Sequence, residues 1–390
     1  MLRFPIACCL LITMLLGLTG CWNKYELVEL GFVLGTALDE GKDGSIILTT
    51  QIYRPSSGST GQGPSNVVSN VMVTTSNATV FEAVRDIPIH LGRKAQWSHM
   101  RVVIISEQLA KHQPLGQLLD YFSRDHEPRQ TLNLIITEGR AADLLKKRPM
   151  IEKTTSQQLL RSVEYSHSTS GKTILTSLLD VAIQFKSAHP DTVISFVHNS
   201  PDEAGIFSAA GLGLFKQEKL VAIMPAKHVQ SLNMLRNQYK TGILEVACEG
   251  KKKTTETFEI IKLNSHVAPV WQQGKVASIH ANIEIVGAIG EMKCIQIKTT
   301  KDEQAFIKLL EQQVKKQVQA AYRYMQKRQI EVIGIGNTIY RSRPKTWFAM
   351  KDEWDTQFSK LPLDLSVKVK IETSGTTTSV PGMSNAGAGS

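Results

Sequence analysis

The stretch from Asp302 to Lys327, DEQAFIKLLEQQVKKQVQAAYRYMQK, carries apolar side chains at three- and four-residue steps. This spacing predicts a long amphipathic helix with one buried face. We expect that face to pack on an antiparallel sheet, with a groove between subunits as the alternative. The apolar positions are Phe306, Leu309, Leu310, Val314, Val318, Ala321, Tyr322 and Met325, and the strands expected around the helix are 254–263, 277–289, 293–297 and 363–372.

The chain before residue 200 alternates between strand patterns and helix patterns. Alternation of this kind predicts a mixed α/β domain. A turn at 199–202 indicates its end, so a domain boundary is predicted near residue 200. The expected strands are 27–39, 45–53, 67–75, 102–106, 131–137 and 192–198, and the expected helices begin near Asn77 or cover 115–123, 141–147, 156–165 and 173–187.

These patterns together predict the fold class α/β (mixed α+β). We expect a multidomain protein with mixed sheets flanked by helices, and with the long C-terminal amphipathic helix packed on an antiparallel sheet. The expected N-terminal α/β domain covers 21–200, and the expected β-rich α+β domain covers 201–373 as one unit or two subdomains. Residues 374–390 have almost no charge or bulk, which predicts a disordered tail. The polar segment 54–65 is typical of a mobile loop.

The first twenty residues have the features of a bacterial export signal. Arg3 precedes an apolar run, residues 4–16, that is too short to span a bilayer as a helix. The run leads into GLTGC, residues 17–21, which has the small residues and the cysteine of a lipobox. We therefore predict a signal peptide at 1–20 and lipid attachment to Cys21. The alternative is an ordinary signal peptide that ends in an incidental cysteine.

Two cysteines remain once the signal peptide is removed and Cys21 is lipidated, namely Cys248 and Cys294. Thiols in an exported chain can pair, but their apolar, strand-like surroundings favour buried free thiols as the expected state. The formal net charge of +10 favours contact with anionic lipid or cell-wall polymer. Export argues against nucleic acid as a partner. The basic groups are dispersed, and the lysine run 251–253 is typical of a solvated turn.

Three segments resemble catalytic or binding motifs without completing them. Residues 168–173 end like a phosphate loop, but position 166 is serine instead of glycine, so a helix start is expected there. Gly334 and Gly336 lack the third glycine of a dinucleotide site. His126 stands between acidic neighbours that would point in different directions, which predicts an ion-paired turn. We therefore predict no catalytic, cofactor-binding or metal-binding residues and no enzymatic activity.

Both ends of the mature chain resemble one protein family. The lipobox continues as CWNKYEL, residues 21–27. This is similar to the Cys-Trp-Asp-x-x-Glu-Leu start of the Ger(x)C family, the lipoprotein C subunits of bacterial spore germinant receptors. The run GIGNTIYRSRPKTW, residues 334–347, looks like the C-terminal signature of that family, together with Trp354, Phe358 and the strand 367–371.

The resemblance extends to nearly the whole mature chain, because His99 and the run 124–129 are similar to parts of the N-terminal domain of the family. Asn23 stands where the family usually has an acidic residue. The run 332–336, VIGIG, replaces a usual Asp-x-Phe-Gly-x-Gly run, which predicts a looser turn at a helix end. Trp347 and Trp354, seven residues apart, would share one helical face and are expected in the core.

The resemblance implies a non-catalytic lipoprotein subunit without cofactors that works beside two integral membrane subunits, an A-type and a transporter-like B-type. It implies a place on the outer face of the spore inner membrane, held by the Cys21 lipid, where small nutrients trigger germination. A scaffolding or coupling role is expected. The alternative class is an extracytoplasmic solute-binding lipoprotein of a transporter, which requires two similar α/β lobes around a cleft. A third class, a cell-wall enzyme, requires paired carboxylates or an activated nucleophile in a cleft.

Overall fold

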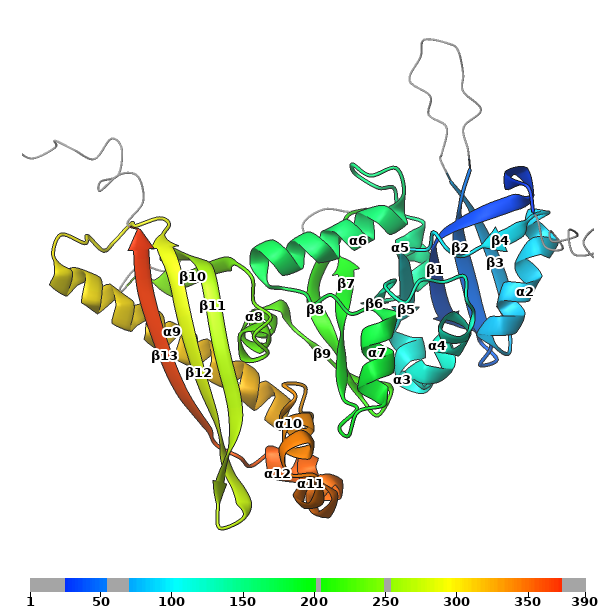
Figure 1. The fold of residues 1–390 in the computed structure, drawn as a ribbon. Helices are drawn as coiled ribbons and strands as arrows, with labels where there is room; N and C mark the ends of the chain where they lie inside the picture. The colour runs from blue at the N-terminus through cyan, green and yellow to red at the C-terminus, as the bar shows by residue number, and fades with distance from the viewer. Residues whose placement is uncertain (1–24, 55–69, 201–204, 249–253, 374–390) are drawn as a thin grey trace, which may run out of the picture.

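The structure is a computed structural model and describes residues 25–54, 70–200, 205–248 and 254–373. The predicted signal peptide with Cys21, the predicted loop beyond Arg54, the lysine run 251–253 and the predicted tail 374–390 lie outside these ranges. Two sheets with their helices make up the described part, one towards each end of the molecule (Figure 1). The predicted fold class of mixed sheets flanked by helices is confirmed.

Nine strands form the N-terminal sheet. They are β1 (Leu30–Glu40), β2 (Ile46–Tyr53), β3 (Asn70–Asn77), β4 (Lys94–Gln96), β5 (Val102–Ser106), β6 (Asn133–Thr137), β7 (Thr192–Asn199), β8 (Phe207–Lys216) and β9 (Lys219–Met224). The order is β3-β2-β1-β5-β6-β7-β8-β9, and β4 pairs with β1. The centre from β1 to β7 is parallel, whereas both edges are antiparallel. Parallel neighbours need a crossover connection, and helices supply it here.

Helices cover both faces of this sheet (Figure 1). They are α2 (Val80–Leu91), α3 (Glu107–His112), α4 (Leu115–Arg124) and α7 (Leu178–Phe185) on one face, and α5 (Ala141–Leu145) and α6 (Thr155–Tyr165) on the other. Alternate side chains of β5 point to opposite faces. Val103 and Ile105 join the first core, and Val102 and Ile104 join the second. A strand buried on both faces needs a continuous apolar run, as β5 has.

Four strands form the C-terminal sheet, in the order β10 (Gly242–Ala247), β11 (Thr255–Gln272), β12 (Lys275–Ile289) and β13 (Leu363–Thr373). The predicted long helix is α9 (Thr300–Gln326), which lies along this sheet (Figure 1). Its Phe306 and Leu310 share one apolar core with Ile283 of the sheet. The prediction of a purely antiparallel sheet is wrong, because β13 runs parallel to β12. The long connection between these two strands contains α9, and such a crossover permits parallel pairing.

Four further α-helices in the described residues are short, namely α8 (Ala226–Leu235), α10 (Ile335–Ser342), α11 (Pro344–Met350) and α12 (Trp354–Phe358). The strand predicted at 293–297 is absent, because the backbone N–H groups of 293–295 bind the Glu256 carboxylate instead of a neighbouring strand. The helix predicted at 173–187 begins only at Leu178, after the Ser177 hydroxyl accepts the N–H of Asp180 as an N-cap.

The N-terminal sheet continues beyond residue 200, where a domain boundary is predicted. β8 pairs with β7 and β9 pairs with β8, so residues 207–224 belong to this sheet. Val193 and Leu212 of the N-terminal sheet lie in the same apolar cluster as Phe306 and Ile283 of the C-terminal unit. The two sheets are therefore joined by shared buried side chains.

Two neighbouring leucines of α9 test which face of the helix is buried. Leu310 is fully buried, whereas Leu309 is 38% exposed. Leu310→Ala should lower the free energy of unfolding by about 2–5 kcal/mol, because it removes apolar contacts and leaves a cavity. Leu309→Ala should lower it by less than about 1 kcal/mol. Equilibrium urea unfolding measures both values, and equal losses would contradict this orientation of the helix.

Candidate functional site

The C-terminal signature packs against a loop of the N-terminal half. We refer to the contact between residues 187–191 and residues 331–355 as the domain junction. The Asn337 side chain accepts the backbone N–H of His189 at 2.9 Å and donates to its carbonyl oxygen at 3.1 Å. From the other side, Gln184 of α7 donates to the carbonyl oxygens of His189 and Asp191, each at 2.8 Å. The loop is thus fixed by one amide side chain from each half.

Glu331 holds the turn between α9 and α10. Its carboxylate accepts three backbone N–H groups, from Ile333 at 2.6 Å, Gly334 at 2.7 Å and Gly336 at 2.9 Å. The residue is 1% exposed. Gly334 has a φ of +102°, a left-handed conformation that glycine adopts without steric cost.

This geometry corrects the prediction of a looser turn. When the last glycine of the six-residue family run is aligned with Gly336, Glu331, five positions earlier, stands at the place of its aspartate. Glutamate therefore replaces the aspartate of the family run, so the acidic side chain is retained and is one methylene group longer. Each N–H bond to an ionised carboxylate is stronger than a neutral hydrogen bond, so Glu331 stabilises the turn.

Trp347 and Trp354 form the apolar part of the domain junction. They are 1% and 0% exposed, so their predicted core location is confirmed. Their rings meet edge to face with centroids 5.8 Å apart, and the Trp347 ring meets the His189 ring at 5.9 Å. The prediction of one helical face is wrong, because a short 3-10 turn, Lys351–Glu353, separates α11 from α12.

Charged groups lie beside these rings. His189 Nε2 is 3.5 Å from Asp355 Oδ1 and 3.7 Å from Asp191 Oδ2, while Lys216 Nζ binds Asp355 Oδ2 at 2.6 Å. Burial raises the pKa of Asp191 to about 6. Burial also opposes ionisation of Asp355, but His189 and Lys216 outweigh it and lower its pKa. Burial lowers the pKa of His189, yet Asp355, Glu331 and Asp191 outweigh it and raise that pKa.

A methyl group at position 336 tests how tightly the domain junction is packed. An ideal Cβ on Gly336 would lie 2.8 Å from the Trp347 ring and 3.0 Å from His189. Gly336→Ala should therefore lower the free energy of unfolding by about 1–3 kcal/mol through overpacking. Alanine in a helix is normally about 0.5–1 kcal/mol more stable than glycine. A gain in stability in chemical denaturation would thus show that the neighbours have room to move.

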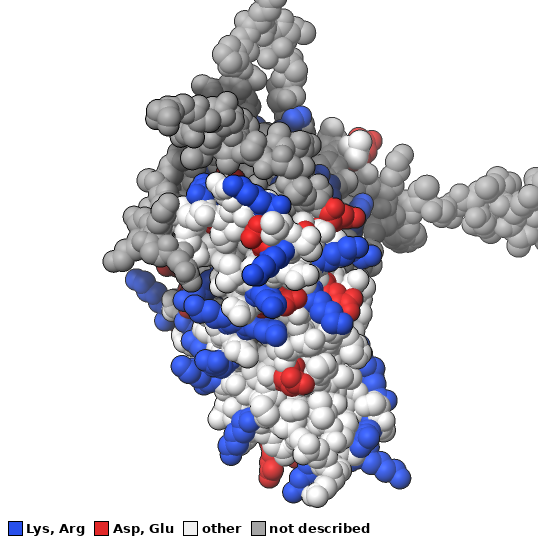
Figure 2. Space-filling model, turned by 90° about the vertical axis from the view of Figure 1, so that its left-hand side faces the viewer, with Lys and Arg blue, Asp and Glu red and all other residues white. Residues whose placement is uncertain are grey.

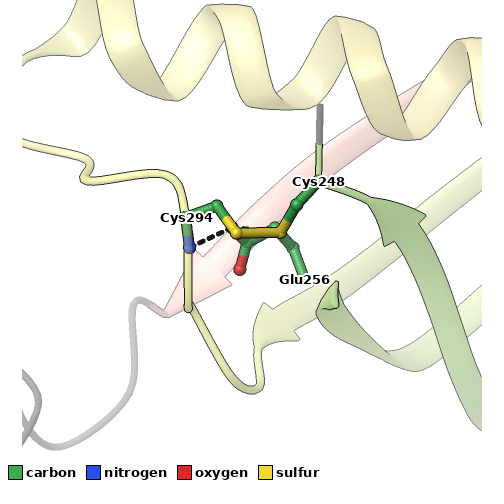
Figure 3. A group of neighbouring side chains, drawn as sticks. All are labelled: Cys248, Glu256 and Cys294. Carbon is green, nitrogen blue, oxygen red and sulfur yellow. Dashed lines mark hydrogen bonds between the residues drawn. A yellow bond between two sulfur atoms is a disulfide. The ribbon is translucent and has the colours of Figure 1, made fainter. Parts of the chain in front are cut away.

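Cys248, Cys294 and Glu256 lie together beside the C-terminal sheet (Figure 3). Cys248 and Cys294 form a disulfide with Cα atoms 6.1 Å apart, so the expected free thiols are wrong. Glu256 is fully buried next to it and accepts the N–H groups of residues 293–295 at 2.6–2.8 Å. The expectation failed because 293–297 is not a strand, which leaves Cys294 free to reach Cys248.

The segments that resemble catalytic motifs have structural roles. The His126 side chain is 93% exposed, and its neighbour Glu127 turns away to Lys94 at 3.1 Å, as expected for an ion-paired turn. Residues 168–173 were expected to start a helix, but they end one. A π-helical turn continues α6 to residue 170, and Gly171 then has a φ of +63°. Cys21, the predicted lipid site, lies outside the described residues.

The charged residues of the domain junction were not predicted from the sequence. His189 and Asp191 flank a proline at the start of a strand, a pattern typical of an ordinary turn. Glu331 stands close to two glycines and is typical of a helix end. The runs HPD, residues 189–191, and EVIGIG, residues 331–336, are the local sequence features that could have indicated these charged residues. The bond between His189 and Asn337 joins residues 148 positions apart, which no local pattern shows.

Positive charge is spread over the C-terminal unit. Figure 2 shows the side of the molecule that carries the C-terminal sheet and α9, with Lys and Arg side chains gathered mainly on its upper part. Acidic side chains lie among them, so the basic groups form no continuous stripe on this face. This agrees with the dispersed basic residues of the sequence. The exposed lysines of α9 and β13 are Lys301, Lys308, Lys316, Lys368 and Lys370.

Comparison with known proteins relates both halves of the chain to spore germination. The family described as "Spore germination protein N-terminal domain" matches residues 23–198. The family described as "Spore germination B3/ GerAC like, C-terminal" matches residues 210–375. The first match ends in β7 and the second begins in β8, so the division between them falls within the N-terminal sheet.

The alignments with individual relatives cover more than nine tenths of this chain and of each relative. Spore germination protein KC of Bacillus subtilis (strain 168) is 25% identical over 395 residues, which cover 94% of this chain and 96% of that protein. Spore germination protein B3 of the same organism is 27% identical over 373 residues, covering 93% and 96%. The crystal structure of the GerBC protein has the same fold, with a TM-score of 0.54 and 24% identity over 87% of this chain and 97% of that one. The chain belongs to the Ger(x)C family of spore germination proteins.

Proposed function

We propose that this protein is the lipid-anchored, non-catalytic C subunit of a spore germinant receptor. The observation that carries the proposal is the match of both family domains along one chain, in the same order and over the same length as relatives named spore germination proteins. In this role it takes part in nutrient-triggered germination with two integral membrane subunits, one A-type and one transporter-like B-type. It would act on the outer face of the spore inner membrane.

The anchor would keep the N-terminal sheet close to the membrane. No helix in the described ranges is both long and apolar enough to cross a bilayer. Cys21 stands nine positions before the start of β1 at Leu30, and nine residues span at most about 30 Å. Two or more acyl chains on Cys21 would hold the protein stably at the surface. The start of β1 would then lie within about that distance of the membrane surface.

Three buried acidic residues, Asp39, Glu256 and Glu331, support a structural rather than a catalytic role. Asp39 accepts the N–H groups of Ala141 at 2.7 Å and Ala142 at 2.9 Å, at the start of α5. Glu256 and Glu331 each accept three backbone N–H groups. These carboxylates are occupied by the backbone that they stabilise. A scaffold that couples membrane subunits needs such fixed turns, and confinement to the membrane raises its effective concentration there.

A solute-binding lipoprotein, the alternative class, does not fit this architecture. That class requires two similar α/β lobes around a cleft. The two sheets here have nine and four strands and different orders. They also share buried side chains, among them Leu212 and Phe306, which opposes the opening and closing of two lobes.

Substitution of the predicted lipid site tests the proposal. Cys21→Ala should release the protein from the spore membrane fraction and abolish palmitate labelling, because the anchor is lost. Dormant spores with this variant should lose the response to one class of nutrient when a panel is scored. Cys9→Ala, in the same leader but outside the lipobox, is the matched control and should leave labelling and germination unchanged.

The two parts of the proposal can fail separately. Labelling that persists in Cys21→Ala would contradict the lipid site. Full germination with every nutrient in a deletion strain that also lacks sister receptors would contradict the receptor role. Impaired solute uptake or wall turnover in growing cells of the same strain would assign the protein to another class.

A further inference from the structure

Two buried carboxylate oxygens at the domain junction have no hydrogen-bond partner among the described residues. They are Asp191 Oδ2 and Asp355 Oδ1. Both face the same atom, His189 Nε2, at 3.7 Å and 3.5 Å. Charge-assisted N–H···O bonds are about 2.7–2.9 Å long, so these separations are too long for hydrogen bonds. An unpaired buried carboxylate oxygen is costly, and the Asp191 side chain is only 3% exposed.

The spacing of these three atoms suits a metal ion. They all lie within 4.8 Å of one another. Ligands that surround Zn²⁺ tetrahedrally at about 2.0–2.1 Å are roughly 3.3 Å apart. The two separations from His189 Nε2 are 3.5 and 3.7 Å, and the two carboxylate oxygens lie within 4.8 Å of each other, so side-chain rotations would bring all three atoms to bonding distance. We propose that His189, Asp191 and Asp355 bind a divalent transition-metal ion, with Zn²⁺ as the best match.

The neighbouring residues orient these three ligands. Lys216 Nζ binds Asp355 Oδ2 at 2.6 Å, which leaves Oδ1 for the ion. On the opposite side of the imidazole ring, Glu331 Oε2 lies 3.9 Å from His189 Nδ1, which is an electrostatic contact and not a hydrogen bond. Metal-binding histidines almost always direct their second ring nitrogen at a carboxylate, a carbonyl or water. The hydrogen bonds of Asn337 and Gln184 hold the backbone of the histidine loop.

The donor set determines the class of ion. One imidazole nitrogen and two carboxylate oxygens suit Zn²⁺ and similar divalent ions, whereas Ca²⁺ takes six to eight oxygen ligands. Three protein ligands leave one position of a tetrahedral site for water. The Asp355 side chain is 25% exposed, which gives the ion access.

A metal at this place would join the two family domains. His189 and Asp191 lie in the segment matched by the N-terminal family domain, and Asp355 lies in the segment matched by the C-terminal one. The free energy of metal binding then adds to the stability of the packed arrangement. The competing arrangement is a protonated His189 that interacts with both carboxylates without an ion, and added Zn²⁺ would then have no effect.

The test uses the full chain, purified in detergent and freed of metal with a chelator. Calorimetric titration with Zn²⁺ should give one ion per chain, and Zn²⁺ should raise the thermal midpoint. Asp191→Asn and Asp355→Asn should each weaken binding at least ~100-fold, since loss of an outer contact alone costs about 10–100-fold. The matched control is Asp364→Asn, because Asp364 lies 2.7 Å from His280 in an exposed pair, and it should bind as the unchanged chain does.

Cobalt gives a readout that does not depend on the variants. Co²⁺ bound to the unchanged chain should show the visible absorption of a four-coordinate site without a thiolate charge-transfer band. A thiolate band would assign the ion to cysteine and overturn the proposal. Absence of binding at millimolar Zn²⁺ would overturn it too, as would equal affinity in folded Asp191→Asn and Asp355→Asn. Circular dichroism of the metal-free variants establishes that they are folded.

Discussion

Cys248→Ala and Cys294→Ala should each lower the free energy of unfolding by about 4 kcal/mol, the value that loop-closure entropy gives for a cross-link of this span. The two cysteines are 46 positions apart and disulfide-bonded. Either substitution opens the same loop in the unfolded chain. The double variant should therefore lose no more than a single variant, because the two effects describe one bond and do not add.

A reductant provides the matched control for this prediction. Dithiothreitol should destabilise the unchanged chain by the same amount in equilibrium urea unfolding and leave Cys248→Ala unaffected. Glu256 remains to hold residues 293–295 in every variant, so the segment keeps its hydrogen bonds while it loses the cross-link. Losses that add in the double variant, or that persist equally in reductant, would show that the two thiols act separately.

Periodic apolar segments could be predicted from the sequence because local spacing determines which side chains are buried. The long helix was expected at 302–327 and covers Thr300–Gln326, and β5 was expected at 102–106 and covers Val102–Ser106. Seven of the eight apolar positions named for the helix are buried, Leu309 being the exception, and every residue of β5 is buried. Local pattern and tertiary packing agree there, which is why the elements were recognisable.

The long-range contacts could not be predicted, at the domain junction or in the C-terminal sheet, because single polar side chains or long crossovers make them between residues far apart in the sequence. Glu256 captures the backbone of 293–295 and prevents the expected strand. His189 meets Asn337 across 148 positions. The parallel pairing of β13 with β12 likewise follows from a crossover that holds several helices. A pattern of apolar residues contains no information about which distant carboxylate or amide will reach a given turn.

Trp347→Ala should lower the free energy of unfolding by about 3–5 kcal/mol, the usual range for removal of a buried tryptophan. The side chain is 1% exposed and contacts Trp354, His189 and the position of a Cβ on Gly336. Phe348 follows it in α11, is 60% exposed and meets the Tyr340 ring edge to face, with centroids 5.8 Å apart. Phe348→Ala should therefore cost only about 0.5–1.5 kcal/mol.

Variants of Trp347 distinguish a role of the C-terminal signature in protein stability from a role in binding a partner. If the signature tryptophan acts through packing, Trp347→Phe should recover part of the stability and of the germination response together, because it refills much of the cavity. Spores with Trp347→Ala should then lose response in proportion to the loss of folded protein. A Trp347→Ala protein that is as stable as the unchanged chain but fails to support germination would instead place this side chain in contact with a partner. Its burial against His189 and Trp354 argues for the first outcome, since a ring enclosed on these sides offers no surface to a second protein.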